Sequence, residues 1–175
     1  VTAFITLNPL FNRPSFTEQS ITYDHHTLYF IDLARSEEDI FNNFSASRRR
    51  ELRRWDESGA CIVCDRDELT LFFLEHYQKF FFERNFSNAY FFAQKSFAYL
   101  LGLSQIYAVG ASTGSGVEAM LLCWHTPFAA EWIFSVRAPE GRKHTAGLIW
   151  TAAKHFWSLN VPVFNLGGGF ESDDN

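Results

Sequence analysis

Residues 126–169 set the architecture and read TPFAAEWIFSVRAPEGRKHTAGLIWTAAKHFWSLNVPVFNLGGG. The aromatic and β-branched run at 128–136 predicts a buried strand, and the Pro and Gly that follow end it. Apolar residues then recur at three- and four-residue spacing, which predicts a helix over 143–158. The apolar run at 161–166 predicts a second strand. Together they form a βαβ-like crossover, a unit at whose strand ends ligands commonly bind.

The composition indicates one folded domain. At 175 residues the chain is long enough for a substantial core but short for two domains. Hydrophobic residues at 47% and charged residues at 20% exclude a disordered chain. The net charge of −5 argues against a generally basic nucleic-acid-binding protein. No apolar run reaches the roughly 18 residues that a membrane span needs.

The cysteines and histidines do not predict a metal site. Cys61 and Cys64 form a CxxC pair, but zinc needs a second ligand pair and Cys123 is the only other thiol. We expect the pair to lie along a strand as small buried side chains. The adjacent His25 and His26 cannot easily share one ion if they lie on a strand. Three cysteines without a disulfide framework fit a reducing cytoplasm, where we expect the protein to act.

Further strands and helices are predicted around the crossover. Serine caps predict helices from Ser36 and from Ser45, the second ending near Gly59. The Gly- and Ser-rich residues 112–116 predict a hairpin, so that 105–136 form an antiparallel meander. Other strands are expected at 2–7, 28–33 and 60–65, and other helices at 67–84 and 88–101. The result is an α/β (α+β) fold with a mixed, mostly antiparallel sheet flanked by helices.

The helix from Ser45 carries a concentrated positive charge. Five of the fifteen basic residues lie within 48–54. Such a patch can attract phosphate or carboxylate, but it can equally be a solvated helix face, since arginine is a good helix former. The residues alone do not decide between an anion-binding patch and a solvated helix face.

Aromatic residues are concentrated further along the chain. Between Phe72 and Phe92, ten of twenty-one residues are Phe or Tyr, which is too many for one amphipathic stripe. We interpret them as core and groove wall, with an interface to another domain as the alternative.

No familiar hydrolase, metal or nucleotide-binding motif occurs in the sequence. The strongest chemical signal is the basic, glycine-containing turn at 137–143 directly before the helix of the crossover. Unpaired N–H groups at such a helix start can bind phosphate.

Several segments, in order, resemble the FemAB-type aminoacyltransferases of the GNAT acyltransferase superfamily. Members of that family attach amino acids from aminoacyl-tRNA to a peptidoglycan precursor. The resemblance implies a GNAT-like fold and transfer of an aminoacyl or acyl group to an amine of a cell-envelope precursor or polymer. The matching segments are Phe4-Ile5-Thr6-Leu7-Asn8-Pro9-Leu10, Ile31-Asp32-Leu33 with Ser36-Glu37-Glu38, the arginine-rich residues 47–54, Ser58-Gly59, the region of Tyr77 and Arg84, the meander, and Phe164-Asn165-Leu166-Gly167-Gly168-Gly169.

The resemblance also implies roles for individual residues. An amine attacks an activated acyl ester through a tetrahedral oxyanion, so the enzyme mainly aligns the partners and stabilises charge. Three groups of side chains follow by position. Arg49, Arg50 and Arg53 would hold substrate phosphate or carboxylate, Arg84, Tyr90 and Arg137 would line the acceptor groove, and Asn165, Gly167 and Gly168 would lie at a strand end beside it. Arg142 and Lys143 would bind the donor.

The donor is expected to be aminoacyl-tRNA or acyl-coenzyme A. The turn at 139–147 is poorer in glycine than the pyrophosphate loop of coenzyme A-dependent GNAT enzymes, which disfavours coenzyme A. The alternatives are a coenzyme A-dependent N- or O-acyltransferase and a non-catalytic GNAT-like module that binds a partner protein or self-associates. We expect residues 1–175 to be one GNAT-like domain of a longer, two-lobed chain.

Overall fold

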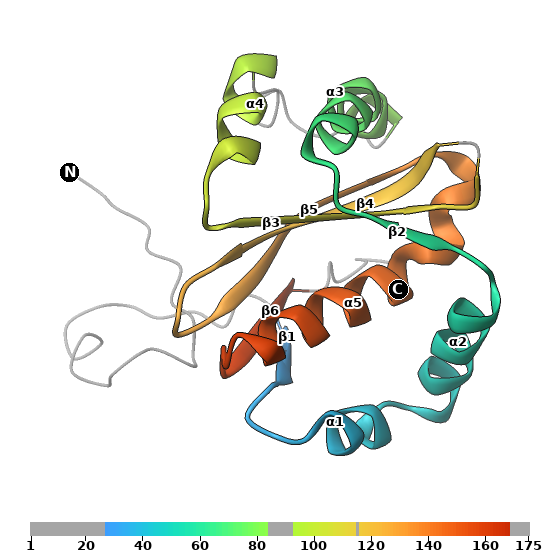
Figure 1. The fold of residues 1–175 in the computed structure, drawn as a ribbon, viewed down its shortest axis with the longest axis vertical. Helices are drawn as coiled ribbons and strands as arrows, with labels where there is room; N and C mark the ends of the chain where they lie inside the picture. The colour runs from blue at the N-terminus through green and yellow to red at the C-terminus, as the bar shows by residue number, and fades with distance from the viewer. Residues whose placement is uncertain (1–26, 84–92, 115, 169–175) are drawn as a thin grey trace, which may run out of the picture.

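The computed structural model describes residues 27–83, 93–114 and 116–168 (Figure 1). The strands are β1 (Leu28–Asp32), β2 (Cys61–Val63), β3 (Ile106–Ser112), β4 (Val117–His125), β5 (Ala130–Arg137) and β6 (Val163–Gly168). The helices are α1 (Glu37–Asn43), α2 (Ala46–Glu57), α3 (Arg66–Glu83), α4 (Gln94–Gly102) and α5 (Thr145–Ser158), with the 3-10 helix η3 (Pro139–His144) before α5.

One mixed sheet of six strands runs through the described part of the molecule, in the order β1-β6-β5-β4-β3-β2. β5 and β6 are parallel neighbours, and the other adjacent pairs are antiparallel. The predicted α/β fold, the meander β3-β4-β5 and the crossover through α5 are therefore confirmed.

Helices cover both faces of the sheet, with α3 and α4 on one side and α1, α2 and α5 on the other (Figure 1). The central strand β4 shows the consequence, because its side chains alternate between two cores. Ala119, Leu121 and Cys123 belong to the core on the α5 side, whereas Met120 and Leu122 belong to the core under α3 and α4. Because helices cover both faces of β4, its apolar residues form a continuous run.

The predicted serine caps start α1 and α2. The Ser36 hydroxyl accepts a hydrogen bond from Asp39 N–H, and the Ser45 hydroxyl accepts one from Arg48 N–H. Each cap satisfies a backbone donor that the first helical turn leaves without a partner. The two helices thus begin where their sequences predict.

The aromatic cluster is confirmed as core for its described members. Phe73 and Tyr77 of α3 pack with Phe97 of α4 and Phe134 of β5, at ring-centroid distances of 4.3–6.0 Å. The side chains of Phe80, Phe81 and Phe82 and the aromatic residues at 86–92 lie outside the described part, as do the expected strand at 2–7 and the His25-His26 pair.

Some boundaries differ from the expectations. The strand expected from residue 128 begins at Ala130, because Thr126 N–H donates to Ala129 O at 2.9 Å and closes a turn that leaves Phe128 exposed. The helix expected from residue 143 begins at Thr145, after the Pro-initiated η3. The helix expected from residue 88 is described only from Gln94.

The expectation that Cys61 and Cys64 are buried is wrong. Both thiols are free and exposed. Cys61 begins β2, a short outer strand of the sheet whose side chains are covered less than those of the inner strands, and Cys64 lies just after the end of β2.

Candidate functional site

The parallel strands β5 and β6 stay together only at their beginning. Their register pairs Ala130 with Phe164 and Glu131 with Asn165, while β5 continues to Arg137 and β6 to Gly168. A bulge bends β5 at this point, because Cys123 pairs with Trp132 and Leu122 with Phe134, which leaves Ile133 as the extra residue. Beyond Glu131, the β6-facing edge of β5 has no strand partner within the described residues. We call residues 132–137 of β5 the open edge.

β6 carries a bulge of its own beside this opening. Tyr29 pairs with Gly167 and Phe30 with Asn165, so Leu166 is the extra residue. The buried Asn165 side chain accepts a hydrogen bond from Gly167 N–H at 2.9 Å, and Gly167 has φ +81°, a conformation that favours glycine. The predicted residues Asn165, Gly167 and Gly168 thus lie at the strand end next to the open edge.

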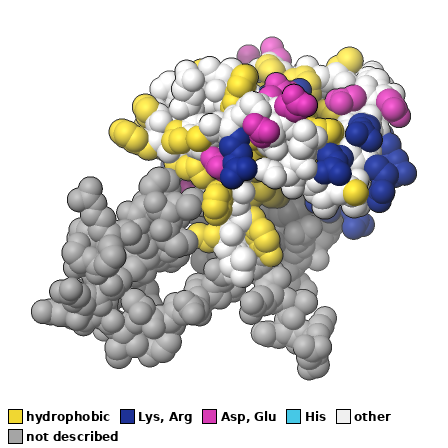
Figure 2. Space-filling model, turned by 90° about the horizontal axis from the view of Figure 1, so that it is seen from below, with side chains coloured by type: hydrophobic (Ala, Val, Ile, Leu, Met, Phe, Trp, Pro, Cys, Tyr) yellow, Lys and Arg dark blue, Asp and Glu magenta, His cyan; other side chains and the backbone are white. Residues whose placement is uncertain are grey.

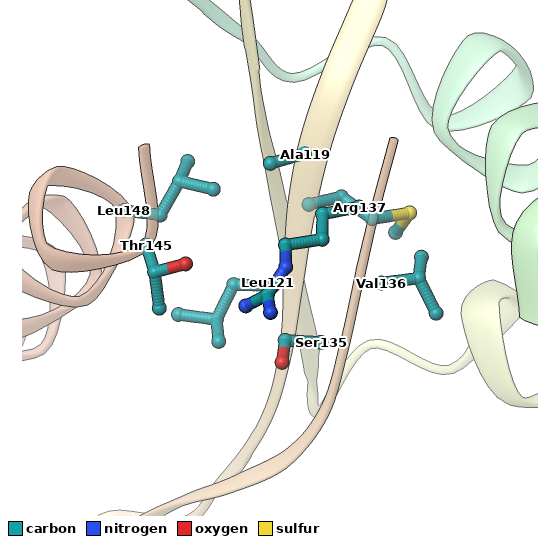
Figure 3. A pocket seen from close by; sticks show the side chains of 8 residues that line it. Ala119, Leu121, Ser135, Val136, Arg137, Thr145 and Leu148 are labelled. Atoms are coloured by element: carbon teal, nitrogen blue, oxygen red, sulfur yellow. The ribbon is translucent and has the colours of Figure 1, made fainter. Parts of the chain in front are cut away.

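A small cavity lies where β5 ends and α5 begins. Figure 3 shows Arg137 extending along the sheet, with Thr145 and Leu148 of α5 facing it. The enclosed space is about 10 Å³, which is room for about one water molecule. The lining residues are Ala119, Met120, Leu121, Ser135, Val136, Arg137, Thr145 and Leu148. Arg137, the last residue of the open edge, therefore lies beside the start of α5.

A buried charged cluster adjoins this cavity. The carboxylate of Glu118 accepts two hydrogen bonds from Thr113, one from the hydroxyl and one from the backbone N–H at 3.3 Å. His144 Nε2 lies 2.9 Å and Lys143 Nζ 3.2 Å from Glu118 Oε2. The hydrogen bonds from Thr113 and His144, together with Lys143, outweigh burial and lower the pKa of Glu118 to about 2. Glu118 is therefore ionised at neutral pH although only 5% of it is exposed.

Two glycines allow the turn and α5 to pack closely on their neighbours. A Cβ at Gly141 would overlap with the backbone carbonyl of Glu118, and a Cβ at Gly147 would overlap with the Trp55 indole of α2. Trp55 also meets His144 edge to face, at a ring-centroid distance of 5.2 Å. The end of α2 is thus held against η3 and the first turn of α5.

The arginines of α2 divide into two groups. Arg49 Nη1 donates to Asn42 O at 2.8 Å and to the carbonyl of Phe44, so this guanidinium ties α2 to the end of α1. Arg50 and Arg53 are exposed, and so is Arg54. Figure 2 shows Lys and Arg side chains gathered at the end of the molecule where α2 lies.

The predicted donor residues lie close to this cationic end. Arg142 and Lys143 are exposed on η3, which the contact of Trp55 with His144 places beside α2. The predicted residues Arg84 and Tyr90 lie outside the described residues. The structure thus brings Arg137, Arg142 and Lys143 together at the start of α5, whereas Asn165 pairs with Glu131 near the beginning of β5.

Sequence reasoning missed Glu118, His144 and Trp55. Glu118 and His144 are 26 residues apart and belong to no motif, so no local pattern pairs them. One weak signal was available: Glu118 is the only acidic residue in an otherwise apolar predicted strand, which indicates a buried charge that needs a partner.

Comparison with known proteins gives no sequence match and clear structural ones. No protein-family model and no curated protein matches the sequence. FemX matches with a TM-score of 0.67 at 10% identity over 85% of this chain and 55% of its own. The C-terminal domain of a protein described as a lysylphosphatidylglycerol synthetase, from Agrobacterium fabrum, matches with a TM-score of 0.59 at 16% identity over 85% and 48%.

The chain shares its mixed α/β fold with FemX and with this C-terminal domain. A conserved protein of unknown function from Bacteroides thetaiotaomicron shares it, with a TM-score of 0.55 at 8% identity over 85% of this chain and 52% of its own. The chain therefore spans about half the length of these three proteins. In the described part of the chain, no helix is long and apolar enough to cross a lipid bilayer.

Proposed function

We propose that this domain is an acyltransferase of FemAB-like type, which transfers an aminoacyl or acyl group to an amine of a cell-envelope precursor or polymer. The observation that carries the proposal is the open edge of β5, which ends beside the cationic start of α5. Backbone groups without a strand partner among the described residues, next to positive charge, suit a reaction through an oxyanion.

The reaction needs little from side chains. The acceptor amine attacks the acyl carbonyl carbon and forms a C–N bond, and the carbonyl oxygen becomes an oxyanion. When the tetrahedral intermediate collapses, the bond from carbon to the donor's oxygen or sulfur breaks and the carrier leaves with that electron pair, while the amine loses a proton. Backbone N–H groups of the open edge would donate to the oxyanion. Holding both reactants on one edge supplies the alignment.

The donor's phosphates would lie on the cationic side of this opening. Arg142 is exposed on η3 and Arg137 lies at the end of β5, where both can pair with phosphate. Arg50, Arg53 and Arg54 share one face of α2, since their spacing is three and four residues. In the described part of the chain these three arginines form no ion pair with a carboxylate.

This extended row of cations favours a polyanionic donor such as aminoacyl-tRNA. One pyrophosphate would need only the groups at η3 and α5, whereas an RNA strand would also use α2. The similarity in fold to FemX and to the lysylphosphatidylglycerol synthetase domain supports this choice. A second GNAT-like lobe would complete the acceptor groove.

A coenzyme A thioester is the second candidate donor. The observation that favours it is the basic turn of η3 directly before α5, a helix start that no serine or aspartate side chain caps. The two donors differ in whether the arginines of α2 contribute to binding.

A titration at several salt concentrations tests the proposal. The protein is titrated with acetyl-coenzyme A and with a short RNA hairpin aminoacylated at its 3′ end, and binding is measured by calorimetry or thermal shift. We expect the RNA to bind with an affinity that falls with salt, and Arg50→Ala and Arg53→Ala to reduce the log–log salt slope by about one each.

The matched control is Lys79→Ala, which removes an exposed cation from α3 on the other face of the sheet and should change nothing. If acetyl-coenzyme A binds, and Arg50→Ala and Arg53→Ala leave its affinity unchanged, the donor is a coenzyme A thioester and not aminoacyl-tRNA. If neither donor binds, the acyltransferase proposal is wrong and a binding module remains.

A further inference from the structure

We propose that Glu118 and His144 are positioning residues, which hold the η3 turn and the first turn of α5 in the geometry that receives the acyl donor. The inference rests on the proposed function, but Glu118 and His144 take no part in the acyl transfer described above. Neither residue lines the opening: His144 is fully buried and Glu118 nearly so.

Glu118 joins the turn at both of its ends. Its backbone carbonyl accepts from Ala138 N–H at 2.9 Å, at the residue before η3, and packs against Gly141 without room for a side chain. Its carboxylate binds Lys143 and His144, the last two residues of η3. One residue of β4 therefore fixes the whole path of the chain from β5 to α5.

The third partner of Glu118 comes from a different loop. Thr113 belongs to the hairpin between β3 and β4, and both its hydroxyl and its N–H donate to Oε1. A buried carboxylate is costly unless its oxygens are satisfied. Because Thr113 satisfies one oxygen, the other is committed to His144 and Lys143, and any movement of η3 away from the sheet would leave it without partners.

His144 occupies the N-cap position of α5 but does not cap the helix. Ser36 and Ser45 use their side chains to bind the first turns of α1 and α2, whereas the His144 side chain makes no cap hydrogen bond. Its ring turns to Glu118, where Nε2 faces an ionised carboxylate that can only accept, so Nε2 donates the hydrogen bond. The first turn of α5 is thereby left without a side-chain cap.

Trp55 holds the other side of the ring. The indole meets His144 edge to face and fills the space that Gly147 leaves open on α5. His144 Nδ1 has no hydrogen-bond partner among the described residues, so the ring is held by one hydrogen bond and by packing. The Nε2 bond to Glu118 is therefore the contact whose loss should release the turn.

Two substitutions at His144 separate this bond from packing. Gln can place its amide N–H near the position of Nε2 and keep the bond to Glu118, whereas the shorter Asn cannot reach it. Thr113→Val is a milder variant, since it removes only the hydrogen bond of the hydroxyl and leaves the Thr113 N–H, Lys143 and His144 contacts of Glu118 in place. It serves if His144→Asn does not fold.

The first measurement is hydrogen exchange of the whole chain, followed by mass spectrometry. We expect His144→Asn, and to a smaller extent Thr113→Val, to accelerate exchange in residues 138–148 while α3 and α4 exchange as in the wild type. His144→Gln should behave like the wild type. Equal acceleration throughout the molecule, or none in 138–148, would overturn the inference without bearing on the donor.

The second measurement is the affinity of the same variants for acetyl-coenzyme A and for the aminoacylated RNA hairpin. Because the turn is misplaced, His144→Asn should bind the donor about tenfold to a hundredfold more weakly than the wild type, and His144→Gln should recover the wild-type affinity. If the wild type binds a donor and His144→Asn binds it equally well, the inference is wrong and the proposed function stands. If the wild type binds neither donor, the proposed function fails and the donor-positioning role fails with it.

Discussion

At the scale of single residues, the contact between Trp55 and Gly147 makes a sharp steric prediction. A Cβ at residue 147 would overlap with the indole, which belongs to a partly buried side chain packed against the core. Gly147→Ala should lower the free energy of unfolding by about 1–3 kcal/mol, the usual cost of overpacking. Denaturant unfolding measures it.

Gly102→Ala is the matched control for that substitution. Gly102 lies in α4, where an added Cβ meets nothing within 4 Å, so alanine should be neutral or stabilise the fold by about 0.4–1 kcal/mol. If Gly147→Ala were as stable as Gly102→Ala, the close packing of α2 on α5 would be wrong.

At the scale of elements, α2 has a structural arginine and a set of exposed ones on the same helix. Arg49 satisfies the carbonyls of Asn42 and Phe44 at the end of α1, where helical carbonyls lack partners. Arg49→Ala should therefore cost about 1–3 kcal/mol of unfolding free energy. Arg50→Ala should change it by less than about 0.5 kcal/mol, since Arg50 is exposed.

Thermal unfolding of the two variants side by side checks this division. A stability loss in Arg50→Ala equal to that in Arg49→Ala would contradict it. The outcome also decides how binding data on α2 are read, because an effect of Arg49→Ala on donor affinity could then come from α1 and α2 moving apart.

The elements that sequence alone predicts are those with local signals. Ser36 and Ser45 precede helices with polar first turns, and the Gly-rich residues 112–116 join two apolar strands, so caps and hairpin follow from neighbouring residues. The bulge at Ile133 and the separation of β5 from β6 depend on how three strands pair, which no single segment encodes.

The candidate site shows the same division. The basic turn before α5 was visible because Arg137, Arg142 and Lys143 are close in sequence. The role of Arg49 was not, since an arginine that binds carbonyls and one that faces solvent look alike in a helical sequence. The pairing of Glu118 with His144 could not be predicted either, because it forms only when the crossover that contains His144 packs against β4 of the meander.

At the scale of the whole molecule, stability should depend on pH in two separate windows. The ring of His155 stacks on that of Tyr107, with 3.9 Å between the ring centroids. Burial and the nearby His125 lower the pKa of His155 below its usual 6.5. A lowered pKa means that the unfolded state binds more protons there, so this contribution is present above about pH 6.5 and is lost as pH falls. His155→Phe, which keeps a ring on Tyr107, should flatten the loss of stability between about pH 7 and 5.

Glu118 acts at lower pH. Its pKa is lowered from 4.5 to about 2, so its contribution is complete above pH 4.5 and is lost as pH falls toward 2. Glu118→Gln should flatten the stability curve below about pH 4.5 and leave the slope between pH 7 and 5 as in the wild type. Thermal unfolding at a series of pH values separates the windows, and a change of slope in the wrong window would refute the assignment.

The central claim is that the open edge of β5 and the start of α5 receive the acyl donor. The most direct test is an NMR titration of the ¹⁵N-labelled protein with acetyl-coenzyme A and with the aminoacylated RNA hairpin, following every assigned amide. We expect one of the two donors to produce saturable shifts in residues 132–137 and 144–148, where the strand edge and the first turn of α5 lie. Saturable shifts confined to α3 and α4, or no saturable shift with either donor, would contradict the claim.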